Sequence, residues 1–463
     1  MADSSRGDKK SDVSAETIRK LAGLRKKFML GSDVDKDVVF DFQFLVNEET
    51  VSYIQEHGKV MFLIRGPPST GKATLSEMIT EKYPKATFCC ADHYFKNSFN
   101  SPSRTKESLK LSHEYCANKT KESLKLSHEY CANKANAACE NNSRVIIIQN
   151  THMRKWEMQH YLNLAATNNY VVIMAITLYR FDVTAEALLA NNTDGLNINY
   201  FRKRLRQWED IPPVLTGWFL CPEDASYLQS LALESLKGLT ADEEFCHIFE
   251  VYNPDEVAHY FKARRLLCCL AGYATDSYEM QNHYLSNIVQ YLYGKCFKIT
   301  ILGYHVTPSV VNAVVHVDDK MELLMFEGCH DYVKNCDFSD YMNKLGITDN
   351  LSEHGKTYEF KNQSSESATA TLEEWDDGEV FLAKQCSFIH LAQRGEDVFD
   401  AGELRKKFKK SLLFAADVED KFTSECFNKL NNGTAVCRVT DNEWLIKAPK
   451  KIGFKTIFTG LYI

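Results

Sequence analysis

Long apolar runs, an apolar signal core and paired cysteine motifs are all missing from this 463-residue chain. No run could span a bilayer and residues 1–12 are polar, so we expect neither a transmembrane segment nor export. None of the 15 cysteines belongs to a C-x-x-C pair, and no pair of Cys or His has finger-like spacing. The sequence therefore predicts a cytoplasmic protein with reduced thiols, without a metal site and without a cofactor.

An excess of positive charge is also missing, since the formal net charge is -7. This balance excludes a chain that is basic over its whole surface, although a local basic patch could still contact nucleic acid. Residues 13–30 form one such patch: apolar residues make one stripe of a short amphipathic helix, and Lys and Arg cover the rest. Two interpretations stay open. The helix docks on the first domain, or it contacts a membrane surface, a calmodulin-type partner or the cytoskeleton.

Apolar runs alternate with helical stretches in the first half of the chain. Residues 60–64, 145–148 and 170–174 are typical of buried parallel strands, so we predict an α/β domain with a parallel sheet. Between the first two runs, the sequence TKESLKLSHEYCANK occurs at 105–119 and again at 120–134. One tandem copy does not make a repeat fold. We expect the duplication to lie in a helical surface segment, and we assign it no function.

A glycine-rich loop follows the first predicted strand. Residues 66–73, GPPSTGKA, differ from the P-loop pattern G-x-x-x-x-G-K-[ST] only at the last position. In that pattern, backbone N–H groups and a helix N-terminus surround a phosphate, and the lysine reaches the outer phosphates. The candidate phosphate-binding residues are Gly66, Ser69, Thr70, Gly71, Lys72 and Thr74.

Both usual anchors for Mg²⁺ are missing from this region. Ala73 stands where the motif has a hydroxyl, and Thr74 should point about 100° further round the helix. The run at 145–148 continues into Gln149, and a neutral amide binds Mg²⁺ much less well than a carboxylate does. Three interpretations stay open: phosphoryl transfer, binding of a nucleotide or phosphate without turnover, and a structural remnant.

Two more residues are candidates for this site. Asp92 follows a predicted strand, where small P-loop kinases place a base or a substrate-binding carboxylate, but a helix N-cap is an equally good explanation. Arg204 belongs to the basic run 202–206. That run either clamps phosphates as a lid helix or forms a solvated helix face.

The chain is too long for one ordinary core. We expect a tail and basic helix over 1–40, a P-loop domain over 41–225, a helical connector over 226–255 and a second domain over 256–463. Within the last domain, the polar and acidic stretch 328–380 is expected to be a mobile insertion.

Several short segments resemble the 2',3'-cyclic-nucleotide 3'-phosphodiesterase family, over about residues 40 to 463. In the first half these segments are FLIRGP at 62–67, ADHY at 91–94, QNTH at 149–152 and GWFL at 217–220. In the second half they are GKCFK at 294–298, VTP at 306–308 and IFTGLY at 457–462. The resemblance implies an α/β P-loop domain like that of polynucleotide kinases, followed by a two-lobed α+β phosphoesterase domain with two histidines.

The resemblance also implies a reaction. The family hydrolyses nucleoside 2',3'-cyclic phosphates to 2'-phosphates without a metal, so a nucleotide or RNA cyclic phosphate would be the substrate. Each of two His-x-Thr motifs supplies one histidine, as general base or general acid, and the threonine hydroxyls hold the phosphate.

This chain departs from that pattern in both motifs. The first should fall near 266–270, which contains no His, and in the second His390 is followed by Ala392. The intact His-x-Thr is formed by His305 and Thr307, on the strand that the resemblance places between the two motifs. His390, His305 and Thr307 are therefore the candidate catalytic residues.

Two main hypotheses follow from these departures. The chain is a phosphodiesterase of this family whose activity is weak or lost, or it is a noncatalytic protein that binds nucleotide or RNA. The family's C-terminal prenylation box is absent, because the last four residues contain no Cys. We therefore expect a cytoplasmic protein that contacts membranes only at their surface.

Overall fold

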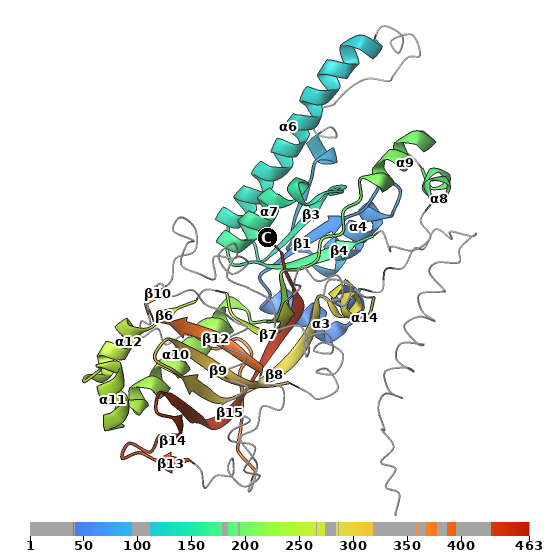
Figure 1. Cartoon of the computed structure of the whole chain (residues 1–463). Helices are drawn as coiled ribbons and strands as arrows, with labels where there is room; N and C mark the ends of the chain where they lie inside the picture. Colours follow the sequence, from blue (N-terminus) through green and yellow to red (C-terminus); the bar gives the residue numbers. More distant parts are fainter. Residues whose placement is uncertain are drawn as a thin grey trace, which may run out of the picture.

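A parallel sheet and a larger antiparallel sheet organise the chain (Figure 1). The computed structural model describes residues 40, 42–94, 112–177, 184–192, 195–264, 266–273, 284–285, 287–317, 358–359, 366–376, 387–394 and 427–462. The basic helix expected over 13–30 lies outside these residues. None of the helices in the described part combines the length and the apolar character that a bilayer crossing requires.

The parallel sheet has the strand order β2-β3-β1-β4. Its strands are β1 (Val60–Arg65), β2 (Thr87–Cys90), β3 (Val145–Gln149) and β4 (Val171–Ile176). Every residue of β1 and β3 is buried, as expected for parallel strands that are covered on both faces. The predicted parallel α/β sheet is thus confirmed, with each of the three predicted runs forming one strand.

Helices surround this sheet. They are α2 (Gln43–Val46), α3 (Glu48–Glu56), α4 (Lys72–Lys82), α6 (Ser112–Glu140), η1 (Lys155–Glu157), α7 (Gln159–Thr167), α8 (Ala185–Ala190) and α9 (Ile198–Arg206). The 29-residue α6 contains the whole second copy of the duplication and the end of the first, and it extends beyond the sheet (Figure 1). Residues 105–111 of the first copy lie outside the described part of the chain.

Eleven strands form the antiparallel sheet. They are β5 (Leu215–Phe219), β6 (Lys262–Ala263), β7 (Cys268–Tyr273), β8 (Lys295–Val306), β9 (Val310–His316), β10 (Tyr358–Glu359), β11 (Thr371–Glu373), β12 (Ser387–Gln393), β13 (Asn428–Lys429), β14 (Ala435–Thr440) and β15 (Glu443–Leu461). Hydrogen bonds link all of them in one network, and the two lobes expected from the resemblance stay a prediction.

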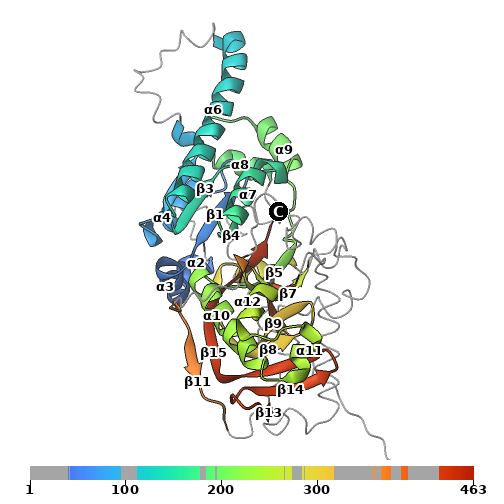
Figure 2. The ribbon, with the colours of Figure 1, turned by 90° about the vertical axis from the view of Figure 1, so that its left-hand side faces the viewer.

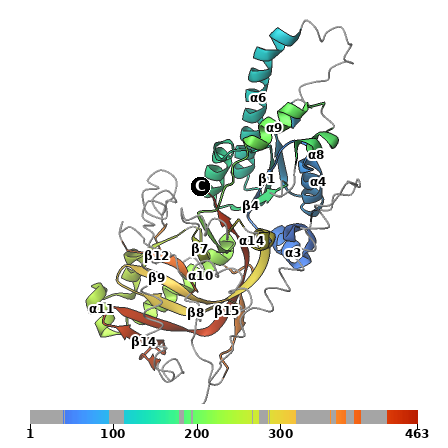
Figure 3. The same cartoon turned by 45° about the vertical axis from the view of Figure 1, so that its right-hand side comes forward.

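The end of the chain joins the two sheets. The C-terminal part of β15 pairs with β5, and Thr459 Oγ1 donates a hydrogen bond to the carbonyl of Val172 on β4 at 2.9 Å (Figure 3). The GWFL segment at 217–220, expected inside the first domain at 41–225, therefore enters the antiparallel sheet through β5. Its partners are β7 and β15, and no local sequence pattern indicates such long-range pairing.

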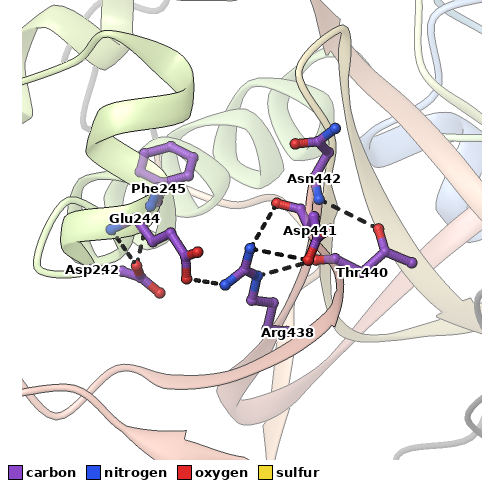
Figure 4. Close-up of polar contacts among 7 residues, drawn as sticks. All are labelled: Asp242, Glu244, Phe245, Arg438, Thr440, Asp441 and Asn442. Carbon is purple, nitrogen blue, oxygen red and sulfur yellow. Dashed lines mark hydrogen bonds and ion pairs between the residues drawn. The ribbon is translucent and has the colours of Figure 1, made fainter.

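Helices cover one face of the antiparallel sheet (Figure 2). They are α10 (Pro222–Leu239), α11 (Glu243–Phe249), η2 (Pro254–Glu256) and α12 (Val257–Tyr260), while α14 (Asn287–Leu292) precedes β8. Arg438 on β14 fastens this layer. Its guanidinium contacts the Glu244 carboxylate on α11 and donates to the carbonyls of Thr440 and Asp441 at 3.2 and 3.1 Å (Figure 4).

Part of the stretch expected to be a mobile insertion, 328–380, has a defined position. Residues 366–376 pack against the sheet, and β11 within them pairs with the middle of β15. The remainder of 328–380, apart from β10, lies outside the described residues, so the mobile insertion stays a prediction.

Candidate functional site

The glycine-rich loop joins β1 to α4, so it lies at the end of the sheet toward which the parallel strands run. Gly71 caps α4 in the left-handed region, with φ of 76°, and α4 begins at Lys72. At Gly66, a Cβ would lie 2.1 Å from Thr177 Oγ1 and 2.8 Å from Thr70 Oγ1. Only glycine permits this close approach, so the loop's tight path explains both of its glycines.

The polar side chains of the loop bind its own backbone. Lys72 Nζ and Thr70 Oγ1 both donate to the carbonyl of Pro67, at 2.7 and 2.8 Å. Thr70 Oγ1 also lies 2.6 Å from Thr177 Oγ1, at the end of β4. Ser69 is held at φ of 65°. The Lys72 ammonium thus lies over the loop, and a phosphate there would replace the Pro67 carbonyl as its partner.

The candidate metal positions are arranged differently from a Mg²⁺ site. Ala73 and Thr74 are both exposed on the first turn of α4. Gln149 ends β3, and the single hydroxyl proton of Ser76 is shared between Gln149 Oε1 and the carbonyl of Lys72, which lies 2.8 Å from Ser76 Oγ. The Gln149 oxygen is therefore already engaged in holding β3 against α4.

Asp92 and Arg204 lie on separate elements near the same edge of the sheet. Asp92 is exposed in the helical turn after β2. Arg204 lies on α9, where its Nε donates to Tyr200 Oη at 3.1 Å and its Nη1 to Gln207 Oε1 at 3.3 Å. These contacts stay within α9 and its C-cap, so they link Arg204 to its own helix.

Arg65 is a central residue of this region that the sequence reasoning missed. It ends β1 and is fully buried, and its guanidinium lies 4.0 Å from the centre of the Trp208 ring. It donates to the carbonyls of His152, Met153 and Glu209 at 3.0, 3.2 and 2.8 Å. Arg65 thereby ties the end of β1 to the loop after β3 and to the chain after α9. A charged residue that closes an otherwise apolar strand was the available signal.

His152 lies beside Arg65 in the loop after β3. It is 2% exposed, and its φ is 43°. Burial, followed by the nearby Arg65 guanidinium, lowers the pKa of His152 to about 3. Its Nε2 has no hydrogen-bond partner among the described residues. His152 is therefore a neutral, buried ring at physiological pH.

The second candidate site is on the antiparallel sheet, where three polar residues lie side by side. His305 on β8 is opposite Asn312 on β9, and Asn312 is opposite His390 on β12. Directly opposed residues of antiparallel strands point to the same face of the sheet. The pairing thus makes a continuous His305–Asn312–His390 row. It brings together the two candidate histidines, with an asparagine between them.

His390 has an amide on each side of its ring. Nδ1 lies 3.1 Å from Asn312 Oδ1, and Nε2 lies 3.3 Å from Gln393 Oε1, which also accepts from Arg264 Nη1 at 3.3 Å. Burial, followed by the Arg264 guanidinium, holds the pKa of His390 well below its usual range. The ring is therefore neutral at pH 7.

A neutral ring donates through one nitrogen, so one of the two amides must present its NH₂ group to His390. Asn312 suits this role, because its Nδ2 is buried and has no other hydrogen-bond partner among the described residues. The Nε2–H of His390 then donates to Gln393 Oε1.

The other end of the row is also buried. His305 has no exposed surface, and its Nε2 lies 4.0 Å from Glu443 Oε2. Thr307 follows the end of β8, where its Oγ1 accepts from the backbone N–H groups of Ser309 and Val310 at 3.4 and 3.2 Å. The hydroxyl of this intact His-x-Thr is therefore part of the turn between β8 and β9.

A β-bulge after His390 changes which residue of the second motif lies on the same face of the sheet as His390. The register between β12 and β9 shifts between His390 and Ala392, and Ala392 is buried in the core on the helix-covered side. Gln393, three positions after His390, is the residue that contacts the His390 ring. By spacing along the chain, Ala392 stands where the His-x-Thr motif has its threonine. In the structure, Gln393 lies beside His390 instead.

β7, one of the strands that pair with β12, contains no histidine. β7 pairs with β12 through Cys269 and Ile389. Because side chains alternate along a strand, β7 presents Cys268 and Leu270 on the face that carries His390. Burial raises the pKa of Cys268 to about 12. A neutral thiol and an alkyl group therefore lie where the resemblance places the first His-x-Thr motif.

No protein-family model matches the chain. The 2',3'-cyclic-nucleotide 3'-phosphodiesterase of Rattus norvegicus is 26% identical over 294 residues, covering 60% of this chain and 64% of the rat protein. The Mus musculus protein of the same name is 26% identical over 311 residues, covering 64% and 69%. The chain is thus similar to these phosphodiesterases over more than half of its length.

The match to the phosphodiesterases is partial in length, since it spans 64% of the rat relative. A solved fungal RNA kinase aligns with 87% of this chain and 99% of its own, at 10% identity and a TM-score of 0.27. A TM-score this low carries no argument. The likeness of this chain to known proteins therefore rests on the phosphodiesterase relatives.

Proposed function

We propose that this chain is a phosphodiesterase-family protein that binds nucleotide or RNA phosphates and hydrolyses 2',3'-cyclic phosphates weakly or not at all. The observation that carries the proposal is the composition of β7, which presents Cys268 and Leu270 beside His390. Hydrolysis needs a base and an acid on opposite sides of the phosphate, and each is typically worth about 10²–10⁴ in rate. With the first motif replaced, one of the pair is missing.

The state of His390 supports the same conclusion. Its lowered pKa keeps the ring neutral at pH 7, so it could accept a proton but has none of the acidity of an imidazolium. Both of its nitrogens already face the amides of Asn312 and Gln393. A water or a leaving oxygen would have to displace one of these amides first.

A second candidate function is hydrolysis at a rebuilt site that uses His305 in place of the lost histidine. The His305–Asn312–His390 row favours it, because both rings lie on one face of the sheet. Against it, Asn312 fills the space between the rings, and the Thr307 hydroxyl is engaged in a turn.

Binding without turnover is the role we propose for the glycine-rich loop. The start of α4 and Lys72 offer N–H groups and a charge to a phosphate, and Ala73 and Gln149 offer little to Mg²⁺. Calorimetry with ATP or GTP tests this role, with Lys72→Ala as the control. Equal affinity of the wild-type protein and Lys72→Ala for the nucleotide would contradict this role. Hydrolysis of a 2',3'-cyclic nucleotide is a separate measurement that tests the candidate site on the antiparallel sheet.

A further inference from the structure

A short acidic segment lies across a group of lysines on the antiparallel sheet. We call residues 371–376, TLEEWD, the strap. β11 within the strap runs antiparallel to the middle of β15, with Thr371 opposite Gly453 and Glu373 opposite Lys451 (Figure 2). The strap lies at the point where β15 shifts its register with β8, between Lys447 and Ile452.

Two glutamates and the tryptophan of the strap contact lysines. The Glu373 carboxylate contacts Lys298, and Glu374 Oε1 lies 2.5 Å from Lys450 Nζ. The Trp375 ring has two ammonium groups over it, those of Lys447 at 4.0 Å and Lys451 at 5.8 Å. We call the four contacted residues the lysine surface: Lys298, Lys447, Lys450 and Lys451.

The strap presents the kinds of group that a short nucleic-acid strand presents, namely anions and an aromatic ring. Two of its carboxylates pair with lysine ammonium groups, as phosphates would. Its indole ring lies against two further lysine ammonium groups, as an unpaired base would. A lysine surface that accepts an anion–aromatic–anion sequence from its own chain has the groups needed to accept one from single-stranded nucleic acid. Double-stranded nucleic acid lacks the free base needed to replace Trp375.

A buried carboxylate holds the residues that lead into the strap. Just before it, the buried Asp224 carboxylate accepts hydrogen bonds from Ser367 Oγ and from the backbone N–H groups of Ala368 and Thr369, at 2.7, 2.9 and 3.0 Å. Thr369 Oγ1 donates to its second oxygen at 2.5 Å. Buried charge-assisted bonds of this kind are strong.

The two ion pairs of the strap are exposed. The Glu373 and Glu374 side chains are 45% and 74% exposed, and their lysine partners are about half exposed. Exposed ion pairs contribute little each and are screened by salt. Trp375 is half-buried, and its Nε1–H donates to the carbonyl of Ala448 at 2.9 Å. A strand that displaces the strap must therefore replace this hydrogen bond and the β11–β15 pairing, while the residues before the strap stay anchored at Asp224.

We propose that the lysine surface is a binding site for single-stranded nucleic acid and that the strap occupies this site when no strand is bound. The lysine surface and the strap share no residue with the His305–Asn312–His390 row or with the glycine-rich loop. The test of this proposal therefore succeeds or fails independently of hydrolysis and of nucleotide binding.

The experiment measures fluorescence anisotropy of a labelled oligouridylate of about 12 nucleotides, a length within the reach of single-strand binding grooves. The full-length protein is compared with a strap variant that combines Glu373→Gln, Glu374→Gln and Trp375→Ala. We expect the strap variant to bind about tenfold more tightly, because two ion pairs and a cation–π contact no longer compete. The matched control is Glu77→Gln with Glu81→Gln, which removes two exposed carboxylates from α4 and should leave the affinity unchanged.

A second set of changes tests the lysines directly. Adding Lys447→Gln, Lys450→Gln and Lys451→Gln to the strap variant should abolish the gain. It should also reduce the salt slope of binding by about 2, since each phosphate contact with a single strand contributes about 0.7. No gain in the strap variant, an equal gain in the α4 control, or equal gain for duplex and single-stranded probes would each overturn the proposal.

Discussion

Replacement of Arg65 by methionine should destabilise the parallel sheet without touching its apolar core. The guanidinium is buried and donates to the carbonyls of His152, Met153 and Glu209. Methionine fills a similar volume but donates no hydrogen bond, so the buried His152 carbonyl loses its donor, while the Met153 carbonyl still accepts from the Glu209 backbone N–H at 3.0 Å. Burial lowers the pKa of Arg65 to about 10, which keeps the side chain charged at neutral pH.

The expected cost is about 3 kcal/mol. Each buried acceptor left without a donor costs about 1–3 kcal/mol, and the lost contact with Trp208 adds about 1 kcal/mol. Relief from burying a cation offsets part of this sum. For a cooperative unit of about 150–250 residues, 3 kcal/mol lowers the Tm by about 6–12 °C.

The assay is a thermal and urea melt of the full chain, followed by near-ultraviolet circular dichroism of the Trp208 environment. Arg144→Met is the matched control, because Arg144 is half exposed and its guanidinium contacts, within the described part of the chain, the Glu56 carbonyl and Glu223. We expect the control to change stability by less than about 0.5 kcal/mol. Arg65→Lys should fall between the two, since one ammonium cannot reach three carbonyls. Equal melting of Arg65→Met and the control would refute the reasoning.

Three further predictions follow from the same contacts. Lys72→Ala should weaken ATP binding measured by calorimetry, and Mg²⁺ should change the wild-type affinity little because Gln149 is a neutral amide bound to Ser76. Stability in urea should fall as the pH drops below about 6.5, by up to ~1.4 kcal/mol per pH unit for each of His152 and His390, because the unfolded chain takes up protons that these buried rings refuse. His152→Gln and His390→Gln should each flatten that slope, and an unchanged slope would contradict the pKa assignments. Deletion of residues 105–119 should leave the melting midpoint nearly unchanged, since a surface helix tolerates a change of length; a large drop would show that both copies pack into the core.

The sequence predicted the features that depend on neighbouring residues. The P-loop pattern and the strand at 60–64 are local, so the loop between β1 and α4 was found from the residues alone. Two strand-like runs near the C-terminus, 444–448 and 455–459, are separated by a lysine-rich stretch and would each be predicted as a strand of its own. They form the single long β15, because the chain crosses a register shift without leaving the sheet.

The candidate site on the antiparallel sheet could not be predicted in the same way. The two-residue spacing of His-x-Thr assumes regular alternation, and the bulge after His390 replaces Ala392 by Gln393 on the site face. Asn312 enters the site only through strand pairing with both histidines, which no spacing along the chain encodes. Arg65 was missed because its three acceptors come from segments far apart in the sequence.

Turnover of 2',3'-cyclic AMP by the full chain is the most direct test of the proposed loss of hydrolysis. The account predicts a rate at least about 10² below that of the rat relative measured alongside, because one member of the base–acid pair is missing. It also predicts that His390→Ala and His305→Ala change this low rate little. Robust hydrolysis that either substitution abolishes would contradict the account and show that the His305–Asn312–His390 row is a working catalytic centre.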